Sequence, residues 1–66
     1  MYKICKKTVY FDGEFKTVYG IQSEKITIDD ITTDFESLER LVMLLNKNDV
    51  SSEHIIDIIE DFIIAN

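Results

Sequence analysis

Two side chains have the chemistry for nucleophilic catalysis, and each is the only residue of its type: Cys5 and His54. A thiol nucleophile needs a base within hydrogen-bond reach. Cys5 falls on the outer face of a predicted β-sheet, whereas His54 falls in a predicted helix that covers the opposite face. The two should therefore lie on opposite sides of the protein. Cys5 is interpreted as a small semi-buried filler, with a reactive thiol as the alternative.

Metal binding at His54 is the second chemical option. Asp57 follows three residues later, so the two side chains share one side of a helix and could provide two metal ligands. Two ligands without a third from elsewhere bind a metal weakly. A first-turn histidine that forms hydrogen bonds near the helix cap is the favoured interpretation.

The sequence also lacks a ready pair of carboxylates for acid–base catalysis and a glycine-rich loop for phosphate binding. The acidic pairs Asp29-Asp30 and Glu60-Asp61 are adjacent in the chain. Neighbours in a strand or a helix point in different directions, so neither pair forms a ready dyad. The two glycines are too few for a phosphate-binding loop. We therefore expect a protein that is not an enzyme and that holds no metal and no cofactor.

Length and composition limit the fold to one small domain, residues 1–66. Hydrophobic residues make up 45% of the chain and charged residues 30%, which is typical of a folded protein. A domain of this size usually relies on disulfides, a metal or a partner. Because there is one cysteine and few metal ligands, the composition favours self-association or a protein partner.

The predicted cellular setting is cytoplasmic, without a membrane partner. No segment approaches the roughly 20 apolar residues of a membrane span. The first ten residues lack the apolar stretch of a signal peptide. A single free cysteine fits a reducing compartment.

Charge is unevenly distributed along the chain. Residues 1–26 carry a net charge of +2 and residues 27–66 a net charge of −8. The acidic half would repel phosphates, so we expect no direct nucleic-acid binding. A solvated helical surface is the simpler interpretation of the acidic half, and an acidic surface that docks on a basic partner is the alternative.

A β-hairpin is predicted at Asp12-Gly13, because both residues tolerate positive φ and β-rich segments flank them. This turn pairs residues 2–11 with residues 14–23. The resulting register places Ile4 opposite Ile21, on the same side of the sheet as every second residue along each strand.

A third strand, residues 25–31, follows a predicted turn at Glu24-Lys25. Its register places Ile28 opposite Ile21, so both turn assignments give the same apolar face. The three strands form an antiparallel meander. Gly20 interrupts the central strand and indicates a bulge or a close approach by another backbone. Space for a partner against the outer face is the alternative.

Two helices, residues 34–47 and 52–64, show apolar side chains with helical spacing. The first opens with a capping-box pattern that begins at Thr33, and the second follows Ser51, a good N-cap. The last helix has a wide apolar arc, as expected for a helix wedged between a sheet and another helix. The predicted fold is α+β, with the meander covered on one face by a helical hairpin.

The outer face of the meander carries apolar side chains among lysines, and an apolar patch rimmed by charge can bind a partner. Exposed helix residues form a second candidate surface. The candidate contact residues are Val9, Phe11, Lys16, Val18, Met43 and Ile64. Scattered exposed apolar residues are also normal, so the structural interpretation stays open.

Short motifs in a characteristic order resemble those of a known family. They are Tyr19-Gly20-Ile21, Asp30-Ile31-Thr32-Thr33-Asp34, Leu41-Val42 with Asn46, Ser51 with His54, and Asp57 with Glu60-Asp61-Phe62. In this order the chain resembles a family of small uncharacterised bacterial proteins, classed as a domain of unknown function. The resemblance covers roughly residues 19–63. It implies a compact bacterial cytoplasmic domain and no assigned activity.

Two functional hypotheses follow. The first is a small non-enzymatic protein-interaction module that binds a protein partner or a second copy as a homodimer. The second is an acidic inhibitor that mimics nucleic acid and blocks a basic nucleic-acid-binding protein. The acidic face of the second hypothesis consists of Glu53, Asp57, Glu60 and Asp61.

Overall fold

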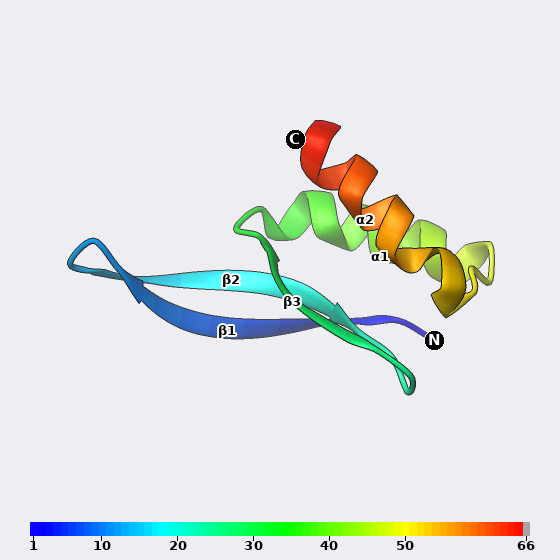
Figure 1. Cartoon of the computed structure of the whole chain (residues 1–66), viewed down its shortest axis with the longest axis horizontal. Coiled ribbons are helices and arrows are strands. Elements are labelled where there is room, and N and C mark those ends of the chain that lie inside the picture. Colours follow the sequence, from blue (N-terminus) through cyan, green and yellow to red (C-terminus); the bar gives the residue numbers. More distant parts are fainter. Residues whose placement is uncertain (66) are drawn as a thin grey trace.

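A computed structural model describes residues 1–65; Asn66, the last residue of the predicted domain, lies outside the described residues. The strands are β1 (Lys3–Phe11), β2 (Glu14–Gln22) and β3 (Thr27–Thr32), and the helices are α1 (Phe35–Lys47) and α2 (Ser52–Ala65). The antiparallel sheet has the order β1-β2-β3, and both helices lie on one face of it (Figure 1). The predicted α+β fold is confirmed.

The β1–β2 hairpin has the predicted turn and register. Asp12 and Gly13 form the turn with φ values of 53° and 80°. Pairing is continuous along both strands, and Ile4 lies opposite Ile21 as expected. The two side chains therefore point to the same face of the sheet, which is the face that the helices cover. We call this the inner face.

The pairing of β3 is regular at one end and bulged at the other. Ile21 pairs with Ile28 as predicted, but the next pair joins Tyr19 to Thr32. Three β3 residues, 29–31, therefore lie opposite Gly20 alone. Asp30 adopts a positive φ of 56° within this bulge. The bulge turns β3 toward the start of α1.

Gly20 makes the bulge possible because it has no side chain. A Cβ at this position would overlap the carbonyl oxygen of Ile28 and lie 2.9 Å from the Cα of Asp29. The predicted bulge with a close backbone approach is therefore confirmed. The alternative, space for a partner at Gly20, is wrong because the chain's own β3 backbone fills that space.

The first helix begins one residue later than the capping-box pattern suggested. Asp34, rather than Thr33, is the N-cap of α1, and its carboxylate accepts hydrogen bonds from the Ser37 amide at 3.2 Å and the Ser37 hydroxyl at 2.6 Å. These bonds lower the pKa of Asp34. A carboxylate that accepts two hydrogen bonds is a better cap here than a hydroxyl. The predicted Ser51 cap of α2 is confirmed, since its hydroxyl accepts from the Glu53 amide at 3.3 Å.

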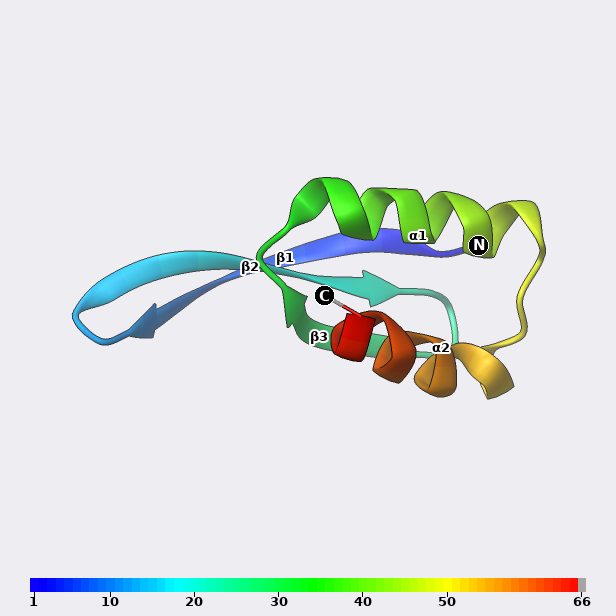
Figure 2. The same cartoon turned by 90° about the horizontal axis from the view of Figure 1, so that it is seen from above.

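The hydrophobic core lies between the sheet and the two helices. Its three largest fully buried side chains are Ile21 from β2, Leu38 from α1 and Ile55 from α2. α1 lies over β1 and β2, whereas α2 lies against β3 (Figure 2). Because α2 packs mainly on one strand, its apolar arc is only partly covered. Ile55 and Ile59 of the predicted arc are buried in the core, whereas Ile56 and Ile63 remain 46% and 51% exposed.

Both ends of α1 are fixed to the sheet. At its last turn the Asn46 side chain accepts the Tyr2 amide at 2.7 Å and donates to the Tyr2 carbonyl at 2.9 Å. The buried Tyr2 phenol also donates to the Val50 carbonyl at 2.8 Å. At the first turn, the Phe35 ring packs edge-on against Tyr19, with centroids 5.2 Å apart. These contacts set the position of α1 along the hairpin.

The hairpin is longer than the helix that covers it. β1 and β2 have nine residues each, and α1 has 13. Those lengths correspond to roughly 30 Å of strand and roughly 20 Å of helix. Figures 1 and 2 show the turn end of the hairpin extending past both helices. The inner face of this end is therefore left without a helical layer.

Substitution of Gly20 tests the bulge. Gly20→Ala should lower the free energy of unfolding by about 3 kcal/mol, because the new methyl group must displace the β3 backbone. The control Gly13→Ala has open space but a positive φ, so it should cost only about 1 kcal/mol. Urea unfolding followed by circular dichroism measures both. An equal or smaller loss in Gly20→Ala would contradict the close approach.

Candidate functional site

Exposed aromatic side chains gather at the uncovered end of the hairpin. Tyr10, Phe11 and Phe15 are 65%, 67% and 75% exposed. Tyr10 and Phe15 face each other across the strands on the inner face, with ring centroids 5.0 Å apart and an interplanar angle of 71°. Phe11 lies on the outer face with the Lys16 Nζ 5.7 Å from its ring centroid. We call these four residues the aromatic tip.

The outer-face predictions are partly corrected by the structure. Phe11 and Lys16 are exposed as expected, and Val9 is half-buried opposite Lys16. Val18 is only 6% exposed, so it offers no contact surface and its assignment as a contact residue is wrong. Val18 lies next to Tyr19, the β2 residue that pairs with the end of β3, whereas Phe11 lies at the turn end of the hairpin, where the sheet has two strands.

The inner-face aromatics of the tip, Tyr10 and Phe15, were missed as site residues. Side-chain alternation correctly places them on the face that the helices cover, which suggested burial. The available signal was length, because nine-residue strands extend beyond a helix of 13 residues. A comparison of the predicted element lengths would have shown that this pair stays uncovered.

The two predicted helix contacts are exposed but lie on separate surfaces. Met43 is 66% exposed and lines a groove of about 470 Å³ beside α1. The groove residues are Ile4, Lys6, Tyr19, Phe35, Glu39, Val42 and Met43. Ile64 is 83% exposed and lies near the end of α2. The structure therefore does not gather the six predicted contact residues into one patch.

The acidic side chains of α2 are all accessible. Glu53, Asp57, Glu60 and Asp61 are exposed, and α2 has no basic residue in its last turn. The predicted acidic face thus exists as a solvent-accessible surface. Its chemistry is that of a row of carboxylates, which attracts cationic groups of a partner.

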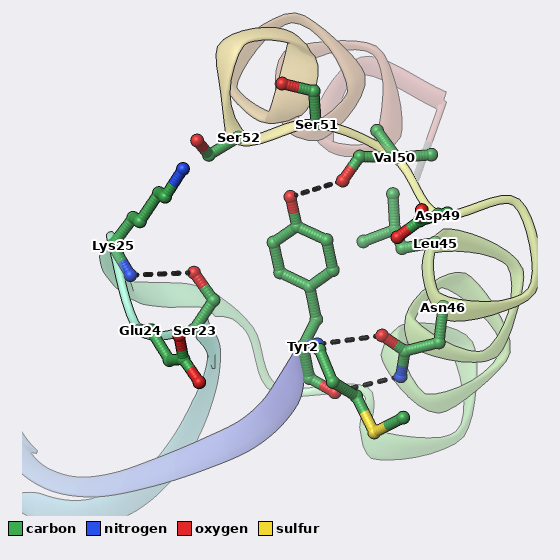
Figure 3. Close-up of a pocket in the computed structure, with 11 residues that line it drawn as sticks. Tyr2, Ser23, Glu24, Lys25, Leu45, Asn46, Asp49, Val50, Ser51 and Ser52 are labelled. Atoms are coloured by element: carbon green, nitrogen blue, oxygen red, sulfur yellow. Dashed lines mark hydrogen bonds between the residues drawn. The ribbon is translucent and has the colours of Figure 1, made fainter.

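A second pocket, of about 420 Å³, lies where the start of β1 meets the β2–β3 turn and the α1–α2 loop (Figure 3). Tyr2 crosses it and is held by the bonds to Asn46 and Val50. Lys25, Ser51 and Ser52 line one side. The lining residues include no histidine and no cysteine, so a serine of this pocket has no imidazole base for nucleophilic attack.

Comparison with the models of known families identifies the family of this chain. The model of a family described as "Family of unknown function (DUF6514)" matches residues 1–65. The chain belongs to this family. Neither the curated proteins nor the solved structures contain a match. The resemblance to a domain of unknown function is therefore confirmed, and family membership assigns no activity.

The described part of this DUF6514 chain was searched for metal sites and for membrane-spanning helices. Across residues 1–65, no three metal-ligating side chains gather into a group that could hold an ion. Over the same residues, neither helix has the length and apolar character needed to cross a bilayer. His54 is exposed on α2.

Cys5 is a weak nucleophile in its surroundings. It is half-buried, and its thiol lies 3.8 Å from the Asp29 carboxylate as a hydrogen-bond donor. Burial and the negative charge of Asp29 raise the pKa of Cys5 above its ordinary value of 9.0. Because the thiolate is the reactive form, little of it is present at neutral pH.

The reactivity of Cys5 therefore depends on Asp29. In the wild-type protein, the rate of iodoacetamide alkylation should rise with pH through a midpoint above 9.0. Asp29→Asn removes the carboxylate charge that opposes ionisation, so its midpoint should move to lower pH. Mass spectrometry of samples quenched across the pH range measures both rates. A wild-type midpoint below 9.0 would contradict the burial of the thiol.

Proposed function

We propose that this protein is a small non-enzymatic protein-interaction module that binds its partner through the aromatic tip. The observation that carries the proposal is the exposure of Tyr10, Phe11 and Phe15, each 65% or more, on a hairpin that extends past the helices. Burying an aromatic side chain removes up to roughly 150–250 Å² of mostly apolar surface from water. Interfaces are enriched in such residues.

The hairpin also presents these rings in a defined geometry. Tyr10 and Phe15 are cross-strand neighbours in edge-to-face contact, and Lys16 lies over Phe11. Each ring is thus partly fixed before a partner arrives, so little side-chain entropy remains to be lost on binding. This favours a contact surface over a loose collection of exposed side chains.

The proposed setting is the cytoplasm. Cys5 carries a free thiol, and the sequence has no second cysteine with which it could form an intramolecular disulfide. Free thiols persist in a reducing compartment.

Removal of the inner-face ring pair tests the proposal. Tyr10→Ser combined with Phe15→Ser should reduce capture of the bound protein by at least about tenfold, because each buried aromatic contributes more than 1 kcal/mol at a contact centre. Immobilised protein is incubated either with an extract of its source cells or with soluble copies of the same chain. The captured protein is then quantified by mass spectrometry. The control, Thr27→Ser with Thr33→Ser, changes two exposed side chains outside the aromatic tip and should capture as the wild type does. Equal capture by the ring variant would contradict the proposal.

The acidic face supports a second candidate function, inhibition of a basic nucleic-acid-binding protein by mimicry of nucleic acid. The supporting observation is that Glu53, Asp57, Glu60 and Asp61 are all exposed on one helix. Electrostatic complementarity of this kind governs association with a cationic surface.

Salt dependence separates the second candidate from the first. Capture of a basic partner should fall by at least about tenfold when salt rises from roughly 50 mM to roughly 500 mM, because ions screen the carboxylates. Replacement of the four acids by Gln or Asn should have the same effect at low salt. The ring variant serves as the control and should retain this binding. Capture that is insensitive to salt would contradict this second candidate function.

A further inference from the structure

We propose that the uncovered inner face of the hairpin binds the exposed side of α2 in a second copy of this chain. The second copy makes the same contact with the first, so that the two chains form a symmetric dimer. This inference rests on the proposed function, and it names the partner of the aromatic tip. The first component is the bare inner face itself, which we call the shelf and which consists of Thr8, Tyr10, Phe15 and Thr17.

The shelf has the form of a seat for one helix. The shelf continues the inner face of the sheet beyond the part that α1 covers. The contact between Phe35 and Tyr19 lies at the boundary between the covered and uncovered parts. Beside this end lies the groove of about 470 Å³ whose lining includes Lys6 and Tyr19. A further helix laid on the shelf would extend the helical layer over the bare end of the sheet, as one layer packs on another within domains.

The second component is the side of α2 that its own domain leaves uncovered. Ile56, Ile63 and Ile64 are 46%, 51% and 83% exposed. Glu53 and Glu60 are exposed on the same side, because all five positions fall within about 100° of the helix circumference. This helix side, which we call the outer side of α2, combines apolar and acidic groups.

The charges of the two components are opposite. Of the four hairpin lysines, Lys6 lies on the inner face beside the shelf, and the other three lie on the outer face. Residues 52–65, helix α2, contain four acids and no lysine or arginine, for a net charge of −4. The shelf therefore offers aromatic rings beside Lys6, and the outer side of α2 offers isoleucines with glutamates. Charge complementarity of this kind selects a partner.

The contact must form between two molecules. The turn end of the hairpin extends away from α2 in both views, so a chain cannot place its own helix on its own shelf (Figures 1 and 2). A two-fold dimer makes each contact twice, because each copy provides one shelf and one helix. This doubles the buried area compared with a single contact.

Exposed aromatic rings beside Lys6 could also stack on the bases of a single strand of nucleic acid. The net charge of −6 opposes that occupant, since phosphates would be repelled from most of the molecule. A second copy satisfies both the apolar and the charged groups of the shelf. The observations thus favour the homodimer.

Charge-reversed variants test the inference. The hairpin variant carries Lys6→Glu, at a position that lies on the inner face beside the shelf, and the helix variant carries Glu53→Lys and Glu60→Lys. Each alone places like charges across both contacts and should weaken dimerisation at least about tenfold at low salt. An equimolar mixture pairs each reversed surface with its complement and should restore the dimer to within about threefold of wild type. Sedimentation equilibrium measures all four samples.

Two further measurements distinguish a loss of dimerisation from a loss of folding. Circular dichroism must give the wild-type spectrum for each protein. Ile64→Glu changes a side chain that is 83% exposed, so it should leave the fold intact and still weaken the dimer at least about tenfold. A wild-type protein that stays monomeric, variants that dimerise as the wild type does, or a mixture that stays monomeric would each overturn the inference. So would binding of labelled oligothymidine by a monomer.

The outcomes separate this inference from the proposed function. If the wild type is monomeric while the Tyr10→Ser, Phe15→Ser variant still loses capture from extract, the second copy is wrong as the partner and the interaction module stands. If that variant also captures as the wild type does, both proposals fail.

Discussion

The attachment of α1 at both of its ends is the constraint on which the rest of the structure depends. Asn46 binds the backbone of Tyr2 with two hydrogen bonds, and Phe35 packs against Tyr19. Between these points the helix covers the near half of the hairpin and can slide in neither direction. Since the strands are longer than the helix, the uncovered shelf is a consequence of this attachment.

The same arrangement divides the apolar residues into two groups. Those between the attachment points, such as Ile21 and Leu38, are fully buried and hold the domain together. Those beyond them, Tyr10 and Phe15, pack against each other and remain exposed. At the other side of the molecule α2 packs mainly against β3 and leaves part of its isoleucine arc exposed. The buried parts of the hairpin and of α2 thus stabilise the fold, and the exposed parts of the same elements are the proposed contact surfaces.

Much of the fold could be predicted because its signals are local. The Asp12-Gly13 turn determined the hairpin register, and the repeat of apolar residues every three or four positions determined the helices. The features that escaped prediction depend on contacts between distant segments. The link from Tyr2 to Asn46, for example, joins positions 44 residues apart. The Asp34 cap differs by one residue, which a pattern cannot resolve. Exposure of the tip required a comparison of lengths across three elements.

The most direct test of the account is a search for contacts between the shelf of one molecule and α2 of another. A sample that mixes isotope-labelled and unlabelled chains allows intermolecular nuclear Overhauser effects to be selected. The account predicts effects between the ring protons of Tyr10 and Phe15 and the methyl groups of Ile56, Ile63 and Ile64. Ring protons that show no intermolecular effect, or effects to a different surface in a dimer, would contradict it.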